Sequence, residues 1–281
     1  MKKFPLIIAI VLILTLVLAG TALAITDGEL DEGRHPHVGL MIALNEDDVP
    51  LWRCSGTLLS PTVFLTAGHC VDELDGAAKA EIWFGDGPIN LGSWIPGFPP
   101  PPCTGETGYP CQGDVSGTIH MYPGYATGPW WMNDVGVVVL DEPYDLAEYG
   151  VLPTLDQFDA LKTKRGQHKT TFTAVGYGLQ KSFPDAAAWK DVAVRIRMVS
   201  HPRLIQINTP GMTGDFSLLL SNNTNTGGTC FGDSGGPNFY KETNVVAGIT
   251  SFGLNPTCAG TGGVFRMDRQ NVLDFVNSFL Q

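Results

Sequence analysis

The stretch Gly232-Asp233-Ser234-Gly235-Gly236-Pro237 is the most informative part of the sequence. A serine with glycines close on both sides indicates a tight turn, because glycine adopts backbone angles that other residues avoid. The backbone N–H groups of such a turn can converge on one point, which is the arrangement that stabilises an oxyanion. The stretch therefore points to Ser234 as a candidate nucleophile.

The same stretch also satisfies the Gly-x-Ser-x-Gly pattern of the α/β-hydrolases, so it does not identify a fold alone. In that class the histidine follows the serine in the chain. All histidines of this chain precede Ser234: His35, His37, His69, His120, His168 and His201. Chain order therefore excludes the α/β-hydrolase interpretation.

A histidine and a carboxylate occur earlier in patterns that suit the serine. His69 lies in a short glycine-containing turn, Thr-Ala-Gly-His-Cys, directly after the apolar run Val63–Leu65. Asp134 stands directly before a second apolar run, Val135–Leu140. A serine is a poor nucleophile unless a base removes its proton, so the order histidine, aspartate, serine is chemically meaningful.

With two further motifs, Gly176-Tyr-Gly178 and Thr250-Ser-Phe-Gly253, the chain resembles the trypsin-like, chymotrypsin-fold serine peptidases over residues 25–281, and in particular their bacterial members. The resemblance implies an all-β fold of two packed six-stranded antiparallel β-barrels with a C-terminal helix. It also implies that the first barrel, residues 25–150, carries His69 and Asp134, and that residues 151–281 form the second barrel and the helix.

The resemblance assigns a role to each member of the triad. Ser234 would be the nucleophile, His69 the general base and then the general acid, and Asp134 the group that orients the imidazole. The N–H groups of Gly232 and Ser234 would form the oxyanion hole. Asp114 and Asp141 compete with Asp134 by position, but the Asn133-Asp134 pair before an apolar strand is the better match.

Substrate recognition also follows from the resemblance. The residues implied to bind substrate are Gly228, Thr229, Ser251, Phe252, Gly253 and Gly263. Gly228 at the floor of the specificity pocket carries no charge, so we expect cleavage after apolar or aromatic residues. The pocket walls fall on Gly253 and Gly263, and a one-residue shift of the alignment would move the second wall position to Gly262, which is also a glycine. Because the backbone of residues 251–253 would pair with an extended chain, the expected partner is a polypeptide substrate.

The N-terminal segment has the pattern of a secretory signal. Lys2 and Lys3 precede the apolar run Leu6–Leu18, and small residues end at Ala24. We therefore expect residues 1–24 to be removed on export, with no stable membrane association afterwards. The competing interpretation is a retained anchor, because the uncharged stretch from Leu6 to Ile25 is long enough to span a bilayer.

Signal removal at Ala24 would release the amino group of Ile25. In the family that the chain resembles, such an amino group pairs with the aspartate before the nucleophile, here Asp233. Asp27 departs from the glycine common in the family's opening motif.

The chain holds six cysteines, an even number that an exported protein can pair completely, although spacing alone leaves fifteen pairings open. The resemblance implies Cys54–Cys70 and Cys230–Cys258, which leaves Cys103–Cys111 within a proline-rich insertion at residues 95–110.

No histidine or cysteine pair has zinc-site spacing, so we expect no metal and no cofactor. The insertion is interpreted as a rigid surface loop, with a recognition motif as the alternative.

Composition agrees with a folded, turn-rich protein. The chain has 281 residues, 43% hydrophobic, with 34 glycines, 20 prolines and a formal net charge of −11, which disfavours nucleic acid and anionic membranes as partners. Alternating patterns predict strands near residues 38–44, 56–59, 82–84, 117–121, 135–140, 170–175, 192–198, 204–207, 216–220, 245–250 and 263–267. A final helix is predicted from Val272 to Leu280, capped by Asp268.

The sequence thus predicts a secreted, monomeric serine endopeptidase. Two alternatives remain: a catalytically silent homologue that binds a partner, and a membrane-anchored protein, which would be a peptidase or an adhesive.

Overall fold

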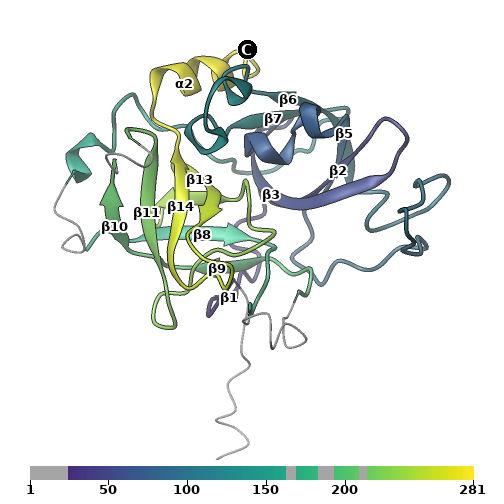
Figure 1. Cartoon of the computed structure of the whole chain (residues 1–281), viewed down its shortest axis with the longest axis horizontal. Helices are drawn as coiled ribbons and strands as arrows, with labels where there is room; N and C mark the ends of the chain where they lie inside the picture. The colour runs from purple at the N-terminus through teal and green to yellow at the C-terminus, as the bar shows by residue number, and fades with distance from the viewer. Residues whose placement is uncertain (1–24, 163–168, 183–192, 209–213) are drawn as a thin grey trace, which may run out of the picture.

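The computed structural model describes residues 25–162, 169–182, 193–208 and 214–281. Its regular secondary structure is mainly β-strands, arranged in two sheets and joined by long loops (Figure 1). The expected all-β fold is confirmed. The signal-like segment 1–24 and His168 lie outside the described residues. Within the described ranges, no helix has the length and apolar character needed to cross a membrane.

The first sheet is a closed antiparallel barrel of six strands in the order β2-β3-β4-β7-β6-β5. Its strands are β2 (Val38–Leu44), β3 (Pro50–Ser60), β4 (Val63–Thr66), β5 (Lys79–Trp83), β6 (Val115–Met121) and β7 (Gly136–Leu140). In β6 the buried Val115 and Ile119 alternate with exposed or half-buried neighbours such as Thr118. This two-residue period places one face of the strand in the barrel core.

The second sheet has eight strands where six were expected, in the order β1-β9-β8-β12-β13-β14-β11-β10. Its strands are β1 (Glu29–Leu30), β8 (Phe172–Gly176), β9 (Met198–Ser200), β10 (Leu204–Ile207), β11 (Ser217–Asn222), β12 (Pro237–Tyr240), β13 (Val246–Gly253) and β14 (Gly260–Arg266). The short strands β1 and β10 account for the difference, because they extend the two ends of the sheet.

The final helix, α2 (Gln270–Asn277), packs against the first barrel (Figure 1). Val272 and Val276 are fully buried, and the Phe275 ring lies 5.3 Å from that of Tyr122. The helix therefore ties the end of the chain to the first barrel.

The predicted cap of this helix is wrong. The N-cap residue is Arg269, and its side chain makes no capping hydrogen bond. Asp268 is instead fully buried and accepts two hydrogen bonds from Arg266. The Asp268 carboxylate therefore does not cap the helix, because it forms a buried ion pair with Arg266.

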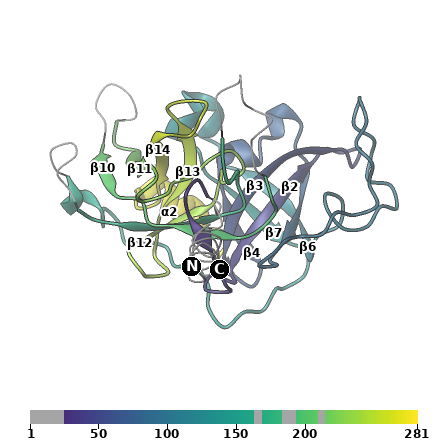
Figure 2. The ribbon, with the colours of Figure 1, turned by 90° about the horizontal axis from the view of Figure 1, so that it is seen from below.

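The insertion between β5 and β6 projects from the first barrel (Figures 1 and 2). The Cys103–Cys111 disulfide closes a loop within it, and the Cys103 amide donates to the Asp48 carbonyl in the turn between β2 and β3. Phe98 and Ile95 are exposed on it.

Candidate active site

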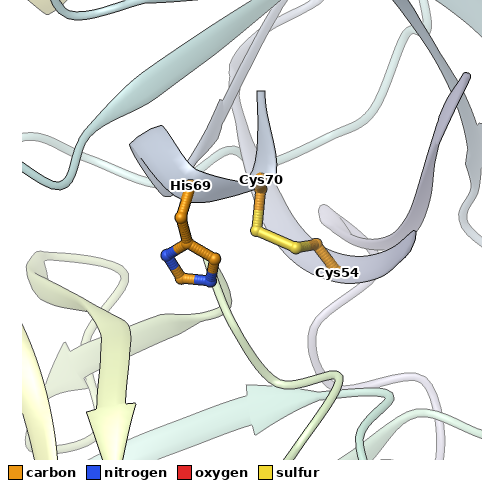
Figure 3. Close-up of side chains that lie close together, drawn as sticks. All are labelled: Cys54, His69 and Cys70. Carbon is orange, nitrogen blue, oxygen red and sulfur yellow. A yellow bond between two sulfur atoms is a disulfide. The ribbon is translucent and has the colours of Figure 1, made fainter. Parts of the chain in front are cut away.

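His69 is positioned by the 3₁₀ turn η1 (Gly68–Cys70), which begins where β4 ends. The Cys54–Cys70 disulfide anchors this turn to β3 (Figure 3). A Cβ at Gly68 would lie 2.7 Å from the Tyr125 ring, so only glycine lets the turn approach this closely. The sequence around His69 therefore fixes where its ring lies.

Asp134 lies directly before β7 and is completely buried behind the histidine. Its carboxylate accepts a hydrogen bond from the His69 backbone amide at 2.9 Å, and its Oδ2 lies 2.9 Å from His69 Nδ1. The Ser251 hydroxyl donates to the same Oδ2 at 2.5 Å. These contacts hold the ring in one orientation, with Nδ1 toward the carboxylate.

The pKa of His69 is raised above its ordinary value. Burial is the largest influence and opposes protonation, but the charge of Asp134 and its hydrogen bond, with a smaller contribution from Asp72, outweigh it. A raised pKa makes the ring a stronger base than a free imidazole. The site is thus suited to accepting a proton.

The turn that carries Ser234, residues 232–236, packs closely against the first barrel. Gly232 and Gly235 have φ angles of 94° and 77°, in the left-handed region that favours glycine. A Cβ at Gly235 would lie 2.1 Å from the Thr66 hydroxyl oxygen. Ser55 of β3 donates its amide to the Ser234 carbonyl at 2.8 Å, so the first barrel sets the position of the turn.

His69 and Ser234 line one cleft of about 850 Å³. The other predicted residues that line it are Gly232, Thr229, Ser251, Phe252 and Gly253. The site residues predicted from the two halves of the chain are therefore brought to one cavity, with Asp134 buried behind it.

Two predicted pocket residues are not among those that line the cleft. The side chain of Asn222 covers Gly228: its Cγ is 2.2 Å from the point that a Cβ on Gly228 would occupy. The Phe252 ring similarly covers Gly263, and Gly262 lines the cleft in its place. The residues that line the cleft thus include Asn222 and Gly262 but not Gly228 or Gly263, and the role of each in substrate binding stays a prediction.

Asn222 is the functional candidate that the sequence analysis missed. Its amide nitrogen donates to the Thr229 carbonyl at 2.7 Å, and its amide oxygen accepts from the Thr26 hydroxyl at 2.7 Å. It stands at the end of β11 with no motif around it, so no signal in the sequence marks it.

Asp233 is buried, and its carboxylate accepts hydrogen bonds from the amides of Gly178 and Cys230. Burial raises its pKa to about 6, against the opposing effects of those amides and of Arg53. Ile25 is also completely buried, and it packs with Met198. No ion pair joins Ile25 and Asp233 in the chain as described, where Ile25 still follows Ala24.

The structure pairs the six cysteines as Cys54–Cys70, Cys103–Cys111 and Cys230–Cys258. The ligand atoms of Cys54, His69 and Cys70 lie within 4.8 Å of one another. Because both sulfurs are in a disulfide, neither is the thiolate that metals bind, and this cluster is a disulfide packed beside a histidine (Figure 3).

Comparison with known proteins gives consistent results. The family model described as Trypsin matches residues 103–276. The venom serine protease Bi-VSP of Bombus ignitus is 25% identical over 83% of this chain, and the aligned part covers 61% of that protein. Brachyurin of Leptuca pugilator is 28% identical over 77% of this chain and 81% of its own length. These relatives are animal proteins, so the expected bacterial affinity is not supported.

Among solved structures, HL collagenase superposes with a TM-score of 0.61 at 18% identity, over 90% of this chain and 96% of that one. At this identity the match establishes the fold alone.

Proposed function

Because the chain belongs to the trypsin family of serine-type endopeptidases, we propose that it is a secreted endopeptidase that cleaves polypeptides through Ser234, His69 and Asp134. One observation carries the proposal. The buried carboxylate of Asp134 holds Nδ1 of His69, and His69 and Ser234 line the same cleft. The catalytically silent alternative has no comparable support, since no triad position is substituted.

In the proposed mechanism, His69 takes the proton of Ser234 as its oxygen attacks the scissile carbonyl. Asp134 stabilises the imidazolium that forms, which is consistent with the raised pKa of His69. The N–H groups of Gly232 and Ser234 would receive the oxyanion. His69 then gives its proton to the leaving amine, and water repeats the sequence on the acyl-enzyme.

We propose that the residue before the scissile bond is apolar or aromatic. Both polar ends of the Asn222 amide are already hydrogen-bonded, to Thr26 and Thr229, so the floor offers no charge to a basic side chain. An arginine there would lose its hydration without gaining a partner, whereas an apolar side chain gains from burial.

A serine-directed phosphonate that carries a leucine or phenylalanine side chain tests the proposed activity. The protein is expected to bind one phosphonate covalently at Ser234, to lose peptidase activity in proportion, and to show no labelling as the Ser234→Ala variant. A folded protein that begins at Ile25 and neither reacts nor cleaves any peptide would contradict the proposed activity.

We further propose that export removes residues 1–24 and that the new amino group of Ile25 pairs with Asp233. A series of contacts between neighbouring residues in the structure supports this pairing. Ile25 packs with Met198, Met198 pairs with Gly176, and a Cβ on Gly176 would lie 2.3 Å from a carboxylate oxygen of Asp233. Pairing would require the segment at Ile25 to rearrange so that the amino group reaches the carboxylate. We also propose that the mature chain divides into two parts: residues 25–150, which carry His69 and Asp134, and residues 151–281, which carry Ser234.

A further inference from the structure

One side of the cleft is formed by the second half of the chain, and the other side by the first barrel. Thr229, Asn222 and Gly262 belong to the second half of the chain, whereas Trp52 and Arg53 lie on β3 and continue into the Cys54–Cys70 disulfide beside His69. In the proposed mechanism His69 protonates the leaving amine. The part of the substrate after the scissile bond must therefore run along this first-barrel wall.

Arg53 is the one permanently cationic side chain among the described residues that line the cleft. It is half-buried, and within the described parts of the chain it makes no hydrogen bond or ion pair. Arg53 lies against the turn of residues 232–236, which carries Ser234 and the proposed oxyanion hole and is called the oxyanion turn below. A Cβ on Gly232 would be 3.0 Å from the Arg53 Nε and 3.1 Å from one of its terminal nitrogens. A guanidinium partly shielded from water and without a partner favours an anionic ligand.

Among the described residues, no carboxylate that lines the cleft or lies near it forms an ion pair with Arg53. Asp75 lines the cleft but is exposed, so solvent screens its charge. Asp72, which also lines the cleft, accepts hydrogen bonds from the amides of Leu74 and Asp75. Asp233 influences Arg53 electrostatically but is held by the amides of Gly178 and Cys230. The guanidinium therefore stays available to a ligand in the cleft.

We propose that Arg53 is a specificity-determining residue that selects polypeptides with Asp or Glu at the first or second position after the scissile bond. This inference rests on the proposed function, which defines the direction of the bound chain. An extended chain advances about 3.3 Å per residue with side chains alternating in direction. One of these two positions therefore directs its side chain toward Arg53, where a carboxylate can bind the guanidinium fork.

The test uses quenched fluorescent peptides with Leu before the scissile bond and either Glu or Gln at the first or the second position after it. At one of the two positions, the wild-type protein should cleave the Glu peptide about fivefold more efficiently than its Gln partner, as a partly shielded ion pair allows. Arg53→Gln should bring this ratio to about one, and Arg53→Glu should replace it with a preference for Lys over Gln. Salt should reduce the wild-type ratio.

Each ratio compares two peptides on one variant, so a general loss of activity or folded fraction cancels. Arg203→Gln, which changes the same charge at an exposed residue outside the cleft, should keep the wild-type ratio. Binding of the same peptides to Ser234→Ala gives the ratio of Kd values without hydrolysis, so failure of the proposed activity and failure of this inference are separated. Equal treatment of Glu and Gln by the wild type in binding and cleavage, or a ratio that survives Arg53→Gln, would overturn the inference.

Discussion

Asp134 never meets the substrate in the proposed mechanism, yet its position determines what His69 can do. Replacing it by Asn keeps the shape but removes the charge that favours the imidazolium. We expect Asp134→Asn, His69→Ala and Ser234→Ala each to lower kcat/KM by about 10⁴-fold with the fold preserved, and the losses not to add. Peptide anilide hydrolysis and circular dichroism measure the two effects. A Ser234→Ala protein that keeps a tenth of the activity contradicts the assignment.

The raised pKa of His69 predicts opposite pH effects on activity and stability. Activity needs the neutral ring, so kcat/KM should fall, as pH decreases, already above the ordinary histidine value of about 6.5. Stability has the other sign: the protonated ring contributes fully below the unfolded pKa, and this contribution is lost as pH rises through the folded pKa. NMR titration of the ring should show its pKa lowered in Asp134→Asn. An unchanged pKa would contradict the role of the carboxylate.

Asn222 gives a test of the specificity pocket through a nearly isosteric change. The wild type should cleave after Phe, Tyr or Leu at least about tenfold more efficiently than after Arg, which corresponds to roughly 1.4 kcal/mol. Asn222→Asp places a carboxylate at the floor and should move the preference toward Arg and Lys. A panel of anilides that differ in one residue measures both proteins. Wild-type preference for Arg would show that a carboxylate already reaches the pocket.

At the scale of elements, the segment after Ile25 couples the N-terminus to the pocket. Thr26 forms an isolated β-bridge with Gly228, and its hydroxyl binds Asn222. We expect the secreted protein to begin at Ile25, and a form with added residues before Ile25 to be less active. N-terminal sequencing and kcat/KM of the two forms measure this. Full activity with another N-terminus would refute the activation pair.

Asp233 supplies a second measurement of the same rearrangement. Its folded pKa of about 6 lies above the usual value, so its contribution to stability is present at low pH and is lost as pH rises through about 6. This loss should be seen in the form that retains residues before Ile25. In the mature form the ammonium should remove it by favouring the charged carboxylate. Melting temperatures at pH 5 and pH 7 compare the two forms.

The success of sequence-based prediction also differs between elements. Residues 38–44 form β2 with the predicted bounds, because the run is apolar and buried throughout. The most regular alternation, at residues 192–198, does not form the predicted strand: residues 193–197 are not in a strand, and only Met198 is, as the first residue of β9. There the Val194 amide binds the Gln180 side chain, and Arg197 is buried in an ion pair with Asp31. Such long-range polar partners leave no periodic signal in the sequence.

The candidate site shows the same division. The motifs around His69, Asp134 and Ser234 are local in sequence. The structure places His69 and Ser234 in one cleft, with Asp134 buried behind His69. Asn222 and Arg53 stand in ordinary strands, and only the packing of distant segments brings them to the cleft. Counting back from Ser234 reached Gly228 but could not reveal that Asn222 covers it.

At the scale of the whole molecule, the cleft depends on how the first barrel meets the oxyanion turn of the second half. Ser55 of β3 is completely buried at this junction. Its hydroxyl donates to the Gly232 carbonyl at 2.9 Å and accepts from the Tyr177 amide at 3.0 Å, and its backbone amide binds the Ser234 carbonyl. One residue of the first barrel thus fixes the turn on which the proposed nucleophile lies.

Ser55→Ala keeps the backbone contact but leaves the Gly232 carbonyl and the Tyr177 amide without the hydroxyl. We expect the free energy of unfolding to fall by about 1–3 kcal/mol, the cost of buried polar groups left unpaired. Because the oxyanion turn loses its support, kcat should fall while KM changes little. Urea unfolding and steady-state kinetics measure the two effects, with Ser60→Ala, at the half-buried end of the same strand, as the matched control. If Ser55→Ala loses stability but keeps the wild-type kcat, the turn is held from within the second half, and the first barrel supplies only His69 and Asp134.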